Sequence, residues 1–120
     1  MEDKIEVNEY IRTNKGNIGK IVEIRLGFNK DTQLYQDIYI LDNGLWTVLD
    51  YIVKHSKIIS EVVNVGDYVN GKLIHKIDKG PNYCYLYYGN CKAFVDYQIK
   101  TILTKESYIA DCYKVGGEDE

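Results

Sequence analysis

One sequence pattern, called here the twice-used phrase, occurs twice in the chain, and each copy is typical of a tight turn between antiparallel β strands. In residues 9–24 and again in residues 66–77, a tyrosine and a β-branched residue precede a glycine turn, and a lysine with alternating aliphatic residues follows it. Alternating polarity is typical of half-buried strands, and glycine permits the positive φ that tight turns need. The phrase therefore predicts strands joined by hairpins. Because the two turns differ in length, we expect the two copies to share the pattern that begins and ends the strands, but not an equivalent site.

Length and charge limit the classes of partner. The 120 residues suit one globular domain, and the net charge of −3 comes from charges of both signs that are interspersed. No broad cationic field is therefore available for nucleic-acid backbones or anionic membranes. The apolar runs are far shorter than the roughly 20 residues of a membrane-spanning helix, and the first residues are too polar for a signal peptide. We expect a cytoplasmic protein without membrane contact.

Strand patterns run through almost the whole chain and predict a mainly β fold. We expect a single β domain over residues 1–115, or two lobes over residues 1–53 and 64–115 that share one core, followed by a flexible acidic tail over residues 116–120. The expected strands include residues 4–12, 18–26, 35–41, 45–49, 72–77, 83–88, 91–96, 99–103 and 108–115, with a polar connection at 27–34 and helical turns at 56–63 and 104–107.

The dipeptide Asn43-Gly44 is a strong hairpin signal, because both residues accept positive φ in a two-residue turn. Such a turn places Leu41 opposite Trp46 and gives the hairpin two apolar faces. A hairpin of this kind belongs in the middle of a fold. We therefore expect Trp46 to be a core anchor.

The hairpin at residues 83–96 carries the best candidate surface. With Gly89-Asn90 as its loop, one face is small and apolar and is expected to point into the core. The other face collects six residues expected to bind a partner: Tyr83, Tyr85, Tyr87, Lys92, Phe94 and Asp96. Tyrosine is apolar along its ring and polar at its tip, which suits a recognition surface. The alternative is that a second sheet or the carboxy-terminal strand covers this row.

The sequence contains few groups of residues with the spacing of catalytic or metal-binding sites. Three cysteines (Cys84, Cys91 and Cys112) and two histidines (His55 and His75) have no zinc-ligand spacing, so we expect buried, reduced cysteines. Most carboxylates precede turns or lie on outward positions, and no glycine-rich phosphate loop leads into a helix. The sequence predicts no metal, no cofactor and no enzymatic activity.

Two resemblances suggest a fold and a setting. Residues 10–22 resemble the opening of KOW and other SH3-like small barrels, in which a turn rich in lysine and glycine joins the first two strands, and this implies an SH3-like barrel. Residues 51–59, 65–71 and 99–106 are similar to small uncharacterised proteins of phages and prophages in AT-rich Gram-positive bacteria. The second resemblance implies the cytoplasm of a bacterial host cell.

The first functional hypothesis is a phage or mobile-element accessory protein. It would bind and inhibit a host antiviral defence component, such as a CRISPR ribonucleoprotein complex or another host protein. Acidic side chains such as Glu61, Asp67 and Asp96 would compete for a basic nucleic-acid groove on that partner, while the tyrosines supply buried contact.

The second hypothesis is a nucleic-acid-binding module. A basic strip of Arg12, Lys15, Lys20 and Arg25, together with Lys92, would meet phosphates while Tyr85, Tyr87 and Phe94 stack on bases. A variant is a sponge that holds a signalling nucleotide at a homo-oligomer interface with the same aromatic residues. A structural role in a virion is a further alternative.

Overall fold

Antiparallel strands dominate the chain, as the sequence patterns predict. The computed structural model describes residues 4–111, and within them lie three antiparallel sheets, three 3₁₀ helices and one α-helix. The expected mainly β fold is confirmed, and none of the described sheets closes into a barrel. The acidic tail predicted at residues 116–120 lies outside the described residues.

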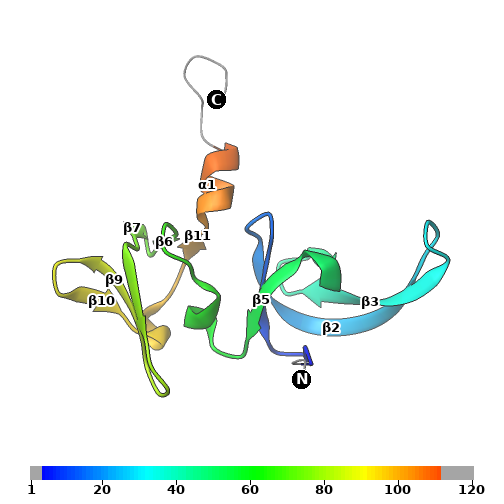
Figure 1. Ribbon diagram of the computed structural model, residues 1–120, viewed down its shortest axis with the longest axis horizontal. Coiled ribbons are helices and arrows are strands. Elements are labelled where there is room, and N and C mark those ends of the chain that lie inside the picture. Colours follow the sequence, from blue (N-terminus) through cyan, green and yellow to red (C-terminus); the bar gives the residue numbers. More distant parts are fainter. Residues whose placement is uncertain (1–3, 112–120) are drawn as a thin grey trace, which may run out of the picture.

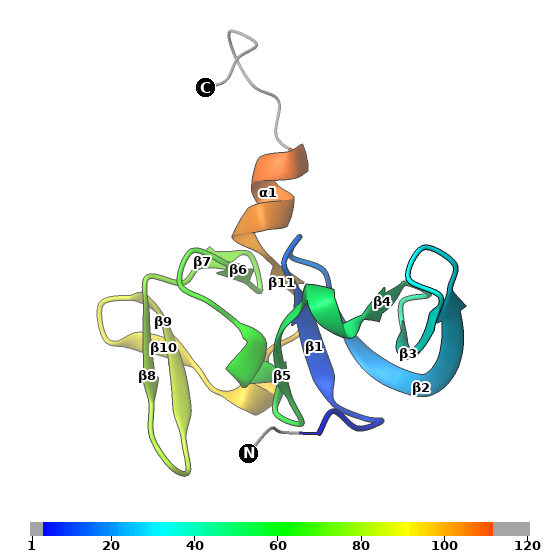
Figure 2. The ribbon, with the colours of Figure 1, turned by 45° about the vertical axis from the view of Figure 1, so that its right-hand side comes forward.

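Residues 5–56 form an amino-terminal unit, which includes β2, β3 and β5 of Figure 1. Its five-stranded sheet has the order β4-β3-β2-β1-β5. Its elements are β1 (Tyr10–Thr13), β2 (Ile18–Asn29), β3 (Leu34–Leu41), β4 (Trp46–Val48), η1 (Leu49–Tyr51) and β5 (Ile52–Ser56). Strands β2 and β3 extend beyond the other strands as a long curved hairpin, which projects from the body of the molecule (Figure 2).

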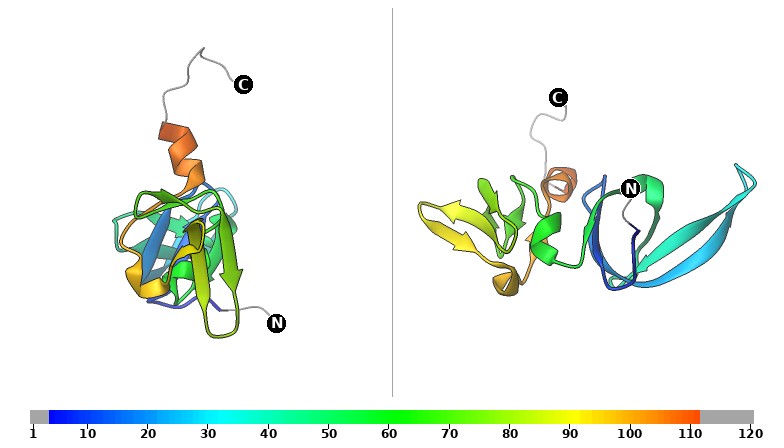
Figure 3. Two further views of the ribbon diagram at one scale, coloured as in Figure 1. Left: turned by 90° about the vertical axis from the view of Figure 1, so that its left-hand side faces the viewer. Right: turned by 60° about the horizontal axis from the view of Figure 1, so that its bottom comes forward.

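Residues 63–103 form a carboxy-terminal unit with two three-stranded sheets, ordered β10-β9-β8 and β11-β6-β7. Its elements are β6 (Tyr68–Val69), β7 (Lys72–Leu73), β8 (Lys76–Lys79), β9 (Cys84–Gly89), β10 (Lys92–Phe94), η3 (Asp96–Gln98) and β11 (Ile102–Leu103). The 3₁₀ helix η2 (Ile59–Val62) connects the two units, and α1 (Lys105–Asp111) follows the second unit. The right-hand view of Figure 3 shows the units side by side, with α1 between them.

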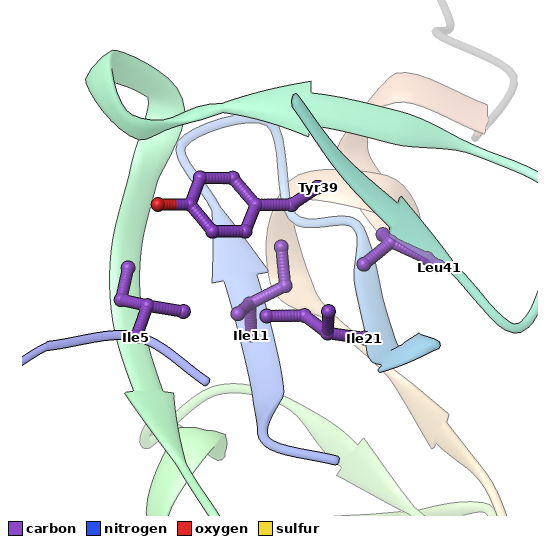
Figure 4. Packing of buried hydrophobic residues seen from close by; sticks show 5 residues of the cluster. All are labelled: Ile5, Ile11, Ile21, Tyr39 and Leu41. Atoms are coloured by element: carbon purple, nitrogen blue, oxygen red, sulfur yellow. The ribbon is translucent and has the colours of Figure 1, made fainter. Parts of the chain in front are cut away.

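Buried side chains form two hydrophobic clusters instead of the single shared core that the sequence suggested. In the amino-terminal unit, Ile5, Ile11, Ile21, Tyr39 and Leu41 point toward one another from the segment before β1 and from the first three strands (Figure 4). In the carboxy-terminal unit, the cluster is formed by buried Val63, Val69, Ile74 and Leu86. Each unit therefore has its own core.

The two units follow the same order of elements. Strands β1, β3, β4 and β5 correspond to β6, β9, β10 and β11, while β2 corresponds to the broken pair β7 and β8, and η1 corresponds to η3. Core residues match in the same order: Ile5 with Val63, Ile11 with Val69, Ile21 with Ile74, Ile24 with Ile77, Tyr39 with Leu86, and Ile52 with Ile99. The two clusters are therefore formed by corresponding positions of the two units.

Backbone hydrogen bonds repeat as well. Ile21 exchanges backbone hydrogen bonds with Asn8 and Glu9, and Ile74 exchanges the same pair with Gly66 and Asp67, all at 2.8–2.9 Å. The twice-used phrase thus occupies equivalent positions in two related units. The turns differ in length, as the sequence indicates, so the correspondence lies in the strands and their backbone hydrogen bonds.

The β3–β4 hairpin differs from its predicted register by one residue. Trp46 pairs with Ile40 rather than with Leu41, and the loop includes Gly44 at a φ of 88°. Because strand side chains alternate with a period of two, this shift moves Trp46 to the outer face. Trp46 is 65% exposed, so the prediction of a core anchor is wrong.

Other elements differ in extent. The first strand covers only Tyr10–Thr13, and the expected polar connection at residues 27–34 is half strand, with a turn confined to residues 30–33. The helical turn predicted at residues 104–107 continues as α1, so the described part of the strand predicted at residues 108–115 is helical instead. Residues 112–115 lie outside the described part.

The start of α1 connects the end of the chain to the β1–β2 turn. The Thr104 hydroxyl donates to the backbone oxygen of Gly16 at 2.8 Å and accepts from the Ser107 backbone N–H at 3.2 Å. Gly16 has a φ of +86°, and a Cβ at this position would overlap with the side chains of Thr104 and Glu106. The contact therefore requires glycine here.

Candidate functional site

Three tyrosines form a row on one face of the β8–β9 hairpin, with Tyr83 immediately before β9 and Tyr85 and Tyr87 within it. Tyr83 and Tyr85 are 45% and 38% exposed, and Tyr87 is half-buried. The ring centroids of Tyr83 and Tyr85 lie 5.3 Å apart, and those of Tyr85 and Tyr87 lie 6.3 Å apart. Aromatic rings attract each other at these separations. The rings therefore form one continuous strip, here named the tyrosine row.

Strand β9 positions the tyrosine row because its side chains alternate across the sheet. Leu86 is fully buried, and Cys84 and Tyr88 pack against the same cluster. The tyrosines between them point to the other face, as the sequence predicts. Tyr83 and Tyr85 stay exposed, so the described part of the chain does not provide the covering sheet of the alternative interpretation.

Strand β8 places charged residues beside the tyrosine row. Lys76 lies opposite Tyr87 in the register, and its Nζ atom lies 5.5 Å from the centre of the Tyr87 ring. Asp78 lies opposite Tyr85, the middle residue of the row. Cations are attracted to the faces of aromatic rings. The Tyr87 end thus already holds a lysine, whereas a carboxylate lies opposite the middle of the row.

Phe94 does not join the tyrosines. Strand β10 pairs Ala93 with Tyr87 and Phe94 with Leu86, after an irregularity in the register. Phe94 consequently faces the core and stacks on Tyr88, with ring centroids 4.3 Å apart. The prediction for Phe94 is wrong because one irregularity in a ladder exchanges the two faces of the strand beyond it.

Lys92 and Asp96, the other two residues predicted to bind a partner, lie toward opposite ends of the β9–β10 hairpin, here called the second hairpin. Lys92 is exposed and pairs with Gly89 beside the hairpin turn. Asp96 is exposed at the start of η3 and lies in a groove with a volume of about 620 Å³. This groove, here named the acidic groove, lies among η2, the β8–β9 turn and η3, and its lining includes Ile58, Ser60, Glu61, Tyr83, Asp96 and Tyr97. Its volume falls within the range typical of ligand pockets.

Fixed donors orient the two carboxylates of the acidic groove. The backbone N–H of Ser60 donates to Asp96 Oδ1 at 2.9 Å, and the Ser56 hydroxyl donates to Glu61 Oε1 at 2.8 Å. The other oxygen of Glu61 lies 3.5 Å from Lys79 Nζ. Each carboxylate has about four lone-pair sites, so both retain acceptor capacity. The Ser60 hydroxyl is buried and has no hydrogen-bond partner among the described residues.

The predicted basic strip is not assembled. Arg12 is 0% exposed, and Arg25 forms an exposed ion pair with Glu23 at 2.8 Å. Lys20 places its Nζ atom 5.7 Å from the centre of the Tyr10 ring, while Lys15 is exposed at the β1–β2 turn. The prediction that Arg12 contacts phosphates is therefore wrong, because the fold buries its guanidinium between the two units.

Arg12 is the centre of a buried ion network that the sequence did not indicate. Its guanidinium donates to both Asp67 oxygens at 2.5 and 2.9 Å, to Glu106 Oε1 at 2.6 Å and to the Val62 carbonyl at 3.0 Å. Burial by itself lowers the pKa of Arg12, but the hydrogen bonds and charges of Asp67 and Glu106 outweigh burial and raise the pKa. The guanidinium therefore joins both units and α1 as a permanent cation.

Asp67 belongs to this network and not to a surface. It is 0% exposed, and besides binding Arg12 it accepts from the backbone N–H groups of Asn64 and Lys105. The expectation that Asp67 competes for a partner's basic groove is therefore wrong. Its position before a glycine-rich turn suggested a local role, but its main partner is 55 residues away in the sequence.

The remaining chemical groups do not converge. Within residues 4–111, no group of three or more histidine, cysteine, aspartate or glutamate side chains could hold a metal ion. Cys84 is half-buried, whereas Cys91 is exposed, against the expectation of burial, and Cys112 lies outside the described residues. His55 Nδ1 lies 2.6 Å from Oε1 of the buried Glu9. The described residues also include no helix long and apolar enough to cross a bilayer.

Sequence reasoning missed Tyr97, which is 80% exposed on η3 and lines the acidic groove. No local pattern identified η3, because three residues provide no periodicity. No protein-family model, curated protein or solved structure matches this chain. The candidate site therefore depends on its own geometry.

Proposed function

We propose that this protein is a non-enzymatic binding protein that docks onto a macromolecular partner through the tyrosine row. The observation that carries the proposal is the row of three partly exposed tyrosine rings, two on β9 and one immediately before it, with neighbouring ring centroids 5.3 and 6.3 Å apart. Tyrosine is enriched in the energetically dominant centres of protein interfaces, because it buries a large area with few rotatable bonds. Strand β9 is paired on both sides, so the rings are held on a rigid element.

A host antiviral defence component is the partner class that we propose. The resemblance of residues 51–59, 65–71 and 99–106 to phage and prophage proteins motivates this choice. The net charge of −3, the carboxylate of Asp78 opposite the middle of the row, and those of Glu61 and Asp96 in the groove beside Tyr83 are complementary to the basic surfaces of proteins that handle nucleic acids. The proposed mechanism is occlusion of such a surface, without a catalytic step.

For the architecture, we propose that both units are open variants of the SH3-like barrel. The order β5-β1-β2-β3-β4, with a 3₁₀ helix between β4 and β5, agrees with that fold. The carboxy-terminal unit repeats this arrangement with η3 between β10 and β11. Such a unit presents its loops and the outer face of its hairpins to a partner, which is where the tyrosine row lies.

The nucleic-acid hypothesis is weaker than the protein-partner hypothesis. Of the aromatic residues expected to stack on bases, Phe94 faces the core. Of the residues expected to bind phosphates, Arg12 is buried in the ion network and Arg25 is paired with Glu23. Lys76 lies at the Tyr87 end of the row, but at the Tyr83 end Lys79 is paired with Glu61, and Asp96 lines the same groove. We therefore assign the tyrosines to a protein surface.

The test combines phage plating with affinity capture. The protein is expressed in bacteria that carry individual defence systems, and plating efficiency is measured for the wild type, for Tyr85→Ser with Tyr87→Ser, and for the control Tyr35→Ser, an exposed tyrosine on β3. We expect the wild type and the control to restore plating against one system and to retain one of its components, and the double variant to do neither. The proposal fails if the double variant is folded and still retains every host component, and still produces every plating effect, that the wild type does.

A further inference from the structure

A hollow on the amino-terminal unit lies between the β1–β2 turn and the segment that runs from the end of β3 to η1. It is here named the tryptophan pocket, because the only tryptophan of the chain lines it. Its volume is about 350 Å³, within the range of about 300–1,000 Å³ that is typical of small-molecule sites. The pocket therefore has room for a small ligand, and it lies on a different unit from the tyrosine row.

Two exposed aromatic rings line the tryptophan pocket. Trp46 is 65% exposed and Tyr51 is 53% exposed, and the two rings do not form an aromatic pair with each other. An exposed ring that lines a hollow offers its face to a planar ligand, and proteins hold nucleobases by stacking them on such faces. The pocket therefore favours a flat, aromatic ligand.

Hydrogen bonds hold the two sides of the pocket together. The Asn14 backbone N–H donates to the Tyr51 carbonyl at 2.9 Å, which fixes η1 against the β1–β2 turn. Within the turn, the Thr13 N–H donates to the Asn17 carbonyl at 2.9 Å, and the Asn17 N–H donates to Thr13 Oγ1 at 3.1 Å. The pocket therefore exists before a ligand binds, which reduces the ordering cost of binding.

The same turn places three polar side chains at the pocket with free hydrogen-bonding capacity. The side chains of Asn14, Lys15 and Asn17 are exposed, and none of them has a hydrogen bond or an ion pair with a described residue. Each amide offers both donors and an acceptor, and the ammonium group offers three donors. These groups can therefore bind a ligand without breaking a contact of the fold.

The charge of the pocket favours an anion. Lys15 is the only charged residue among the described residues that line it, although the whole chain has 18 acidic and 15 basic side chains. Glu106 lies beside Gly16 of the same turn, but it already accepts from the Arg12 guanidinium at 2.6 Å. Hydrogen bonds between a lysine and a phosphate are among the stronger ones in proteins. The pocket thus combines a stacking surface with one cation.

We propose that the tryptophan pocket binds one nucleotide. Its base stacks on Trp46, with Tyr51 beside it, and its phosphate binds Lys15. The amides of Asn14 and Asn17 hydrogen-bond to the edge of the base. One cation and a small volume suit a single nucleotide, and a free nucleotide shares this chemistry with the terminal nucleotide of a strand. The inference goes beyond the proposed function, because it assigns a second ligand to the other unit and does not use the tyrosine row.

Trp46 reports binding directly, because it is the only source of tryptophan fluorescence in the chain. The full chain is titrated with the four ribonucleoside 5′-monophosphates, with the matching nucleosides and with inorganic phosphate, and N-acetyltryptophanamide corrects for absorption and collisional quenching. We expect saturable quenching by at least one nucleotide, binding of its nucleoside that is weaker by about five-fold or more, and no quenching by phosphate alone. Absence of saturable quenching by all four nucleotides, or equal affinity for nucleotide and nucleoside, would overturn the proposal.

Variants that keep the fluorescent reporter separate stacking from charge. Tyr51→Ser retains the backbone carbonyl that holds η1, and we expect it to weaken the nucleotide about five-fold or more. Lys15→Met is expected to reduce nucleotide affinity to that of the nucleoside and to leave nucleoside binding unchanged. The matched controls are Tyr35→Ser and Lys30→Met, on the β2–β3 hairpin outside the pocket, and we expect neither to change binding. Equal effects of the pocket variants and their controls would refute the site.

A short oligonucleotide with a 5′-phosphate distinguishes the two sources of the ligand. Tighter binding of the oligonucleotide than of the mononucleotide, lost in Tyr51→Ser, would identify the end of a strand, whereas equal binding would identify a free nucleotide. Oligonucleotide binding that persists in Tyr51→Ser, with no binding of any mononucleotide, would overturn the proposal. None of these outcomes depends on the tyrosine row, so the proposed function stands or fails separately.

Discussion

Replacing Arg12 by methionine removes the cation that joins the two units, while it keeps most of the side-chain stem. The replacement leaves Asp67, which is 0% exposed, without its bidentate partner, and it also leaves Glu106 and the Val62 carbonyl without a donor. Asp67 retains two backbone donors, Asn64 and Lys105, which reduce the penalty but do not neutralise the charge. We therefore expect a large loss of stability.

The magnitude follows from the burial of both charges. Removing one partner of a buried ion pair costs about 3–5 kcal/mol, because the remaining charge is left unpaired in a medium of low polarity. Small domains have an unfolding free energy of about 5–15 kcal/mol, so this loss is a large fraction of the total. For a chain of this length, the unfolding entropy is about 0.25 kcal/mol per kelvin, and the Tm is expected to fall by about 12–20 °C.

Urea unfolding followed by far-ultraviolet circular dichroism measures this loss. The matched control is Arg25→Met, which removes an arginine from an exposed pair with Glu23, and we expect little change in stability because solvent screens the pair. Adding Asp67→Asn to Arg12→Met is expected to recover part of the loss, because it removes the unpaired charge. A loss below about 1 kcal/mol for Arg12→Met, or equal losses for both arginines, would refute the buried network.

Three further predictions address the turn, the register and a buried amine. Gly16→Ala is expected to destabilise the chain by about 2–4 kcal/mol, whereas Gly44→Ala, with a similar φ but no neighbour within 4 Å, loses about 1 kcal/mol; thermal melts of both variants decide this. Phe94→Ala is expected to cost about 2–4 kcal/mol and Tyr83→Ala about 1 kcal/mol or less in urea unfolding, and the reverse order would contradict the observed faces of the second hairpin. Burial, and then the nearby cations Arg12 and Lys79, lower the pKa of Lys54 below 10.5, so its charge in the folded state opposes folding at neutral pH. As the pH rises toward 10.5, Lys54 loses its proton first in the folded state, and we expect the wild type to gain stability relative to Lys54→Met. A constant difference between their unfolding free energies across this pH range would refute this.

The faces of individual strands were predictable, but the pairing between strands was not. Alternation in β9 assigned Leu86 to the core and Tyr83, Tyr85 and Tyr87 to the surface, because the period of two is local. The partners of these residues depended on the turn: an irregularity before Ala93 carried Phe94 to the core. The same kind of shift exposed Trp46 in the first hairpin. The Trp46 error arose because a glycine-containing dipeptide indicates a turn without fixing its exact position or length, and the Phe94 error because the sequence does not indicate a bulge in the ladder.

The sequence by itself determined the mainly β class, the two copies of the hairpin phrase and the outward position of the tyrosine row, because these follow from contacts between neighbours along the chain. Only the tertiary structure decided that Arg12 is buried, because its partners lie 50, 55 and 94 residues away. The acidic groove likewise brings together residues 58–61, 83 and 96–97, which no local pattern connects. The burial of a charge and the shape of a groove depend on which distant segments of the chain come into contact, and tertiary packing determines those contacts.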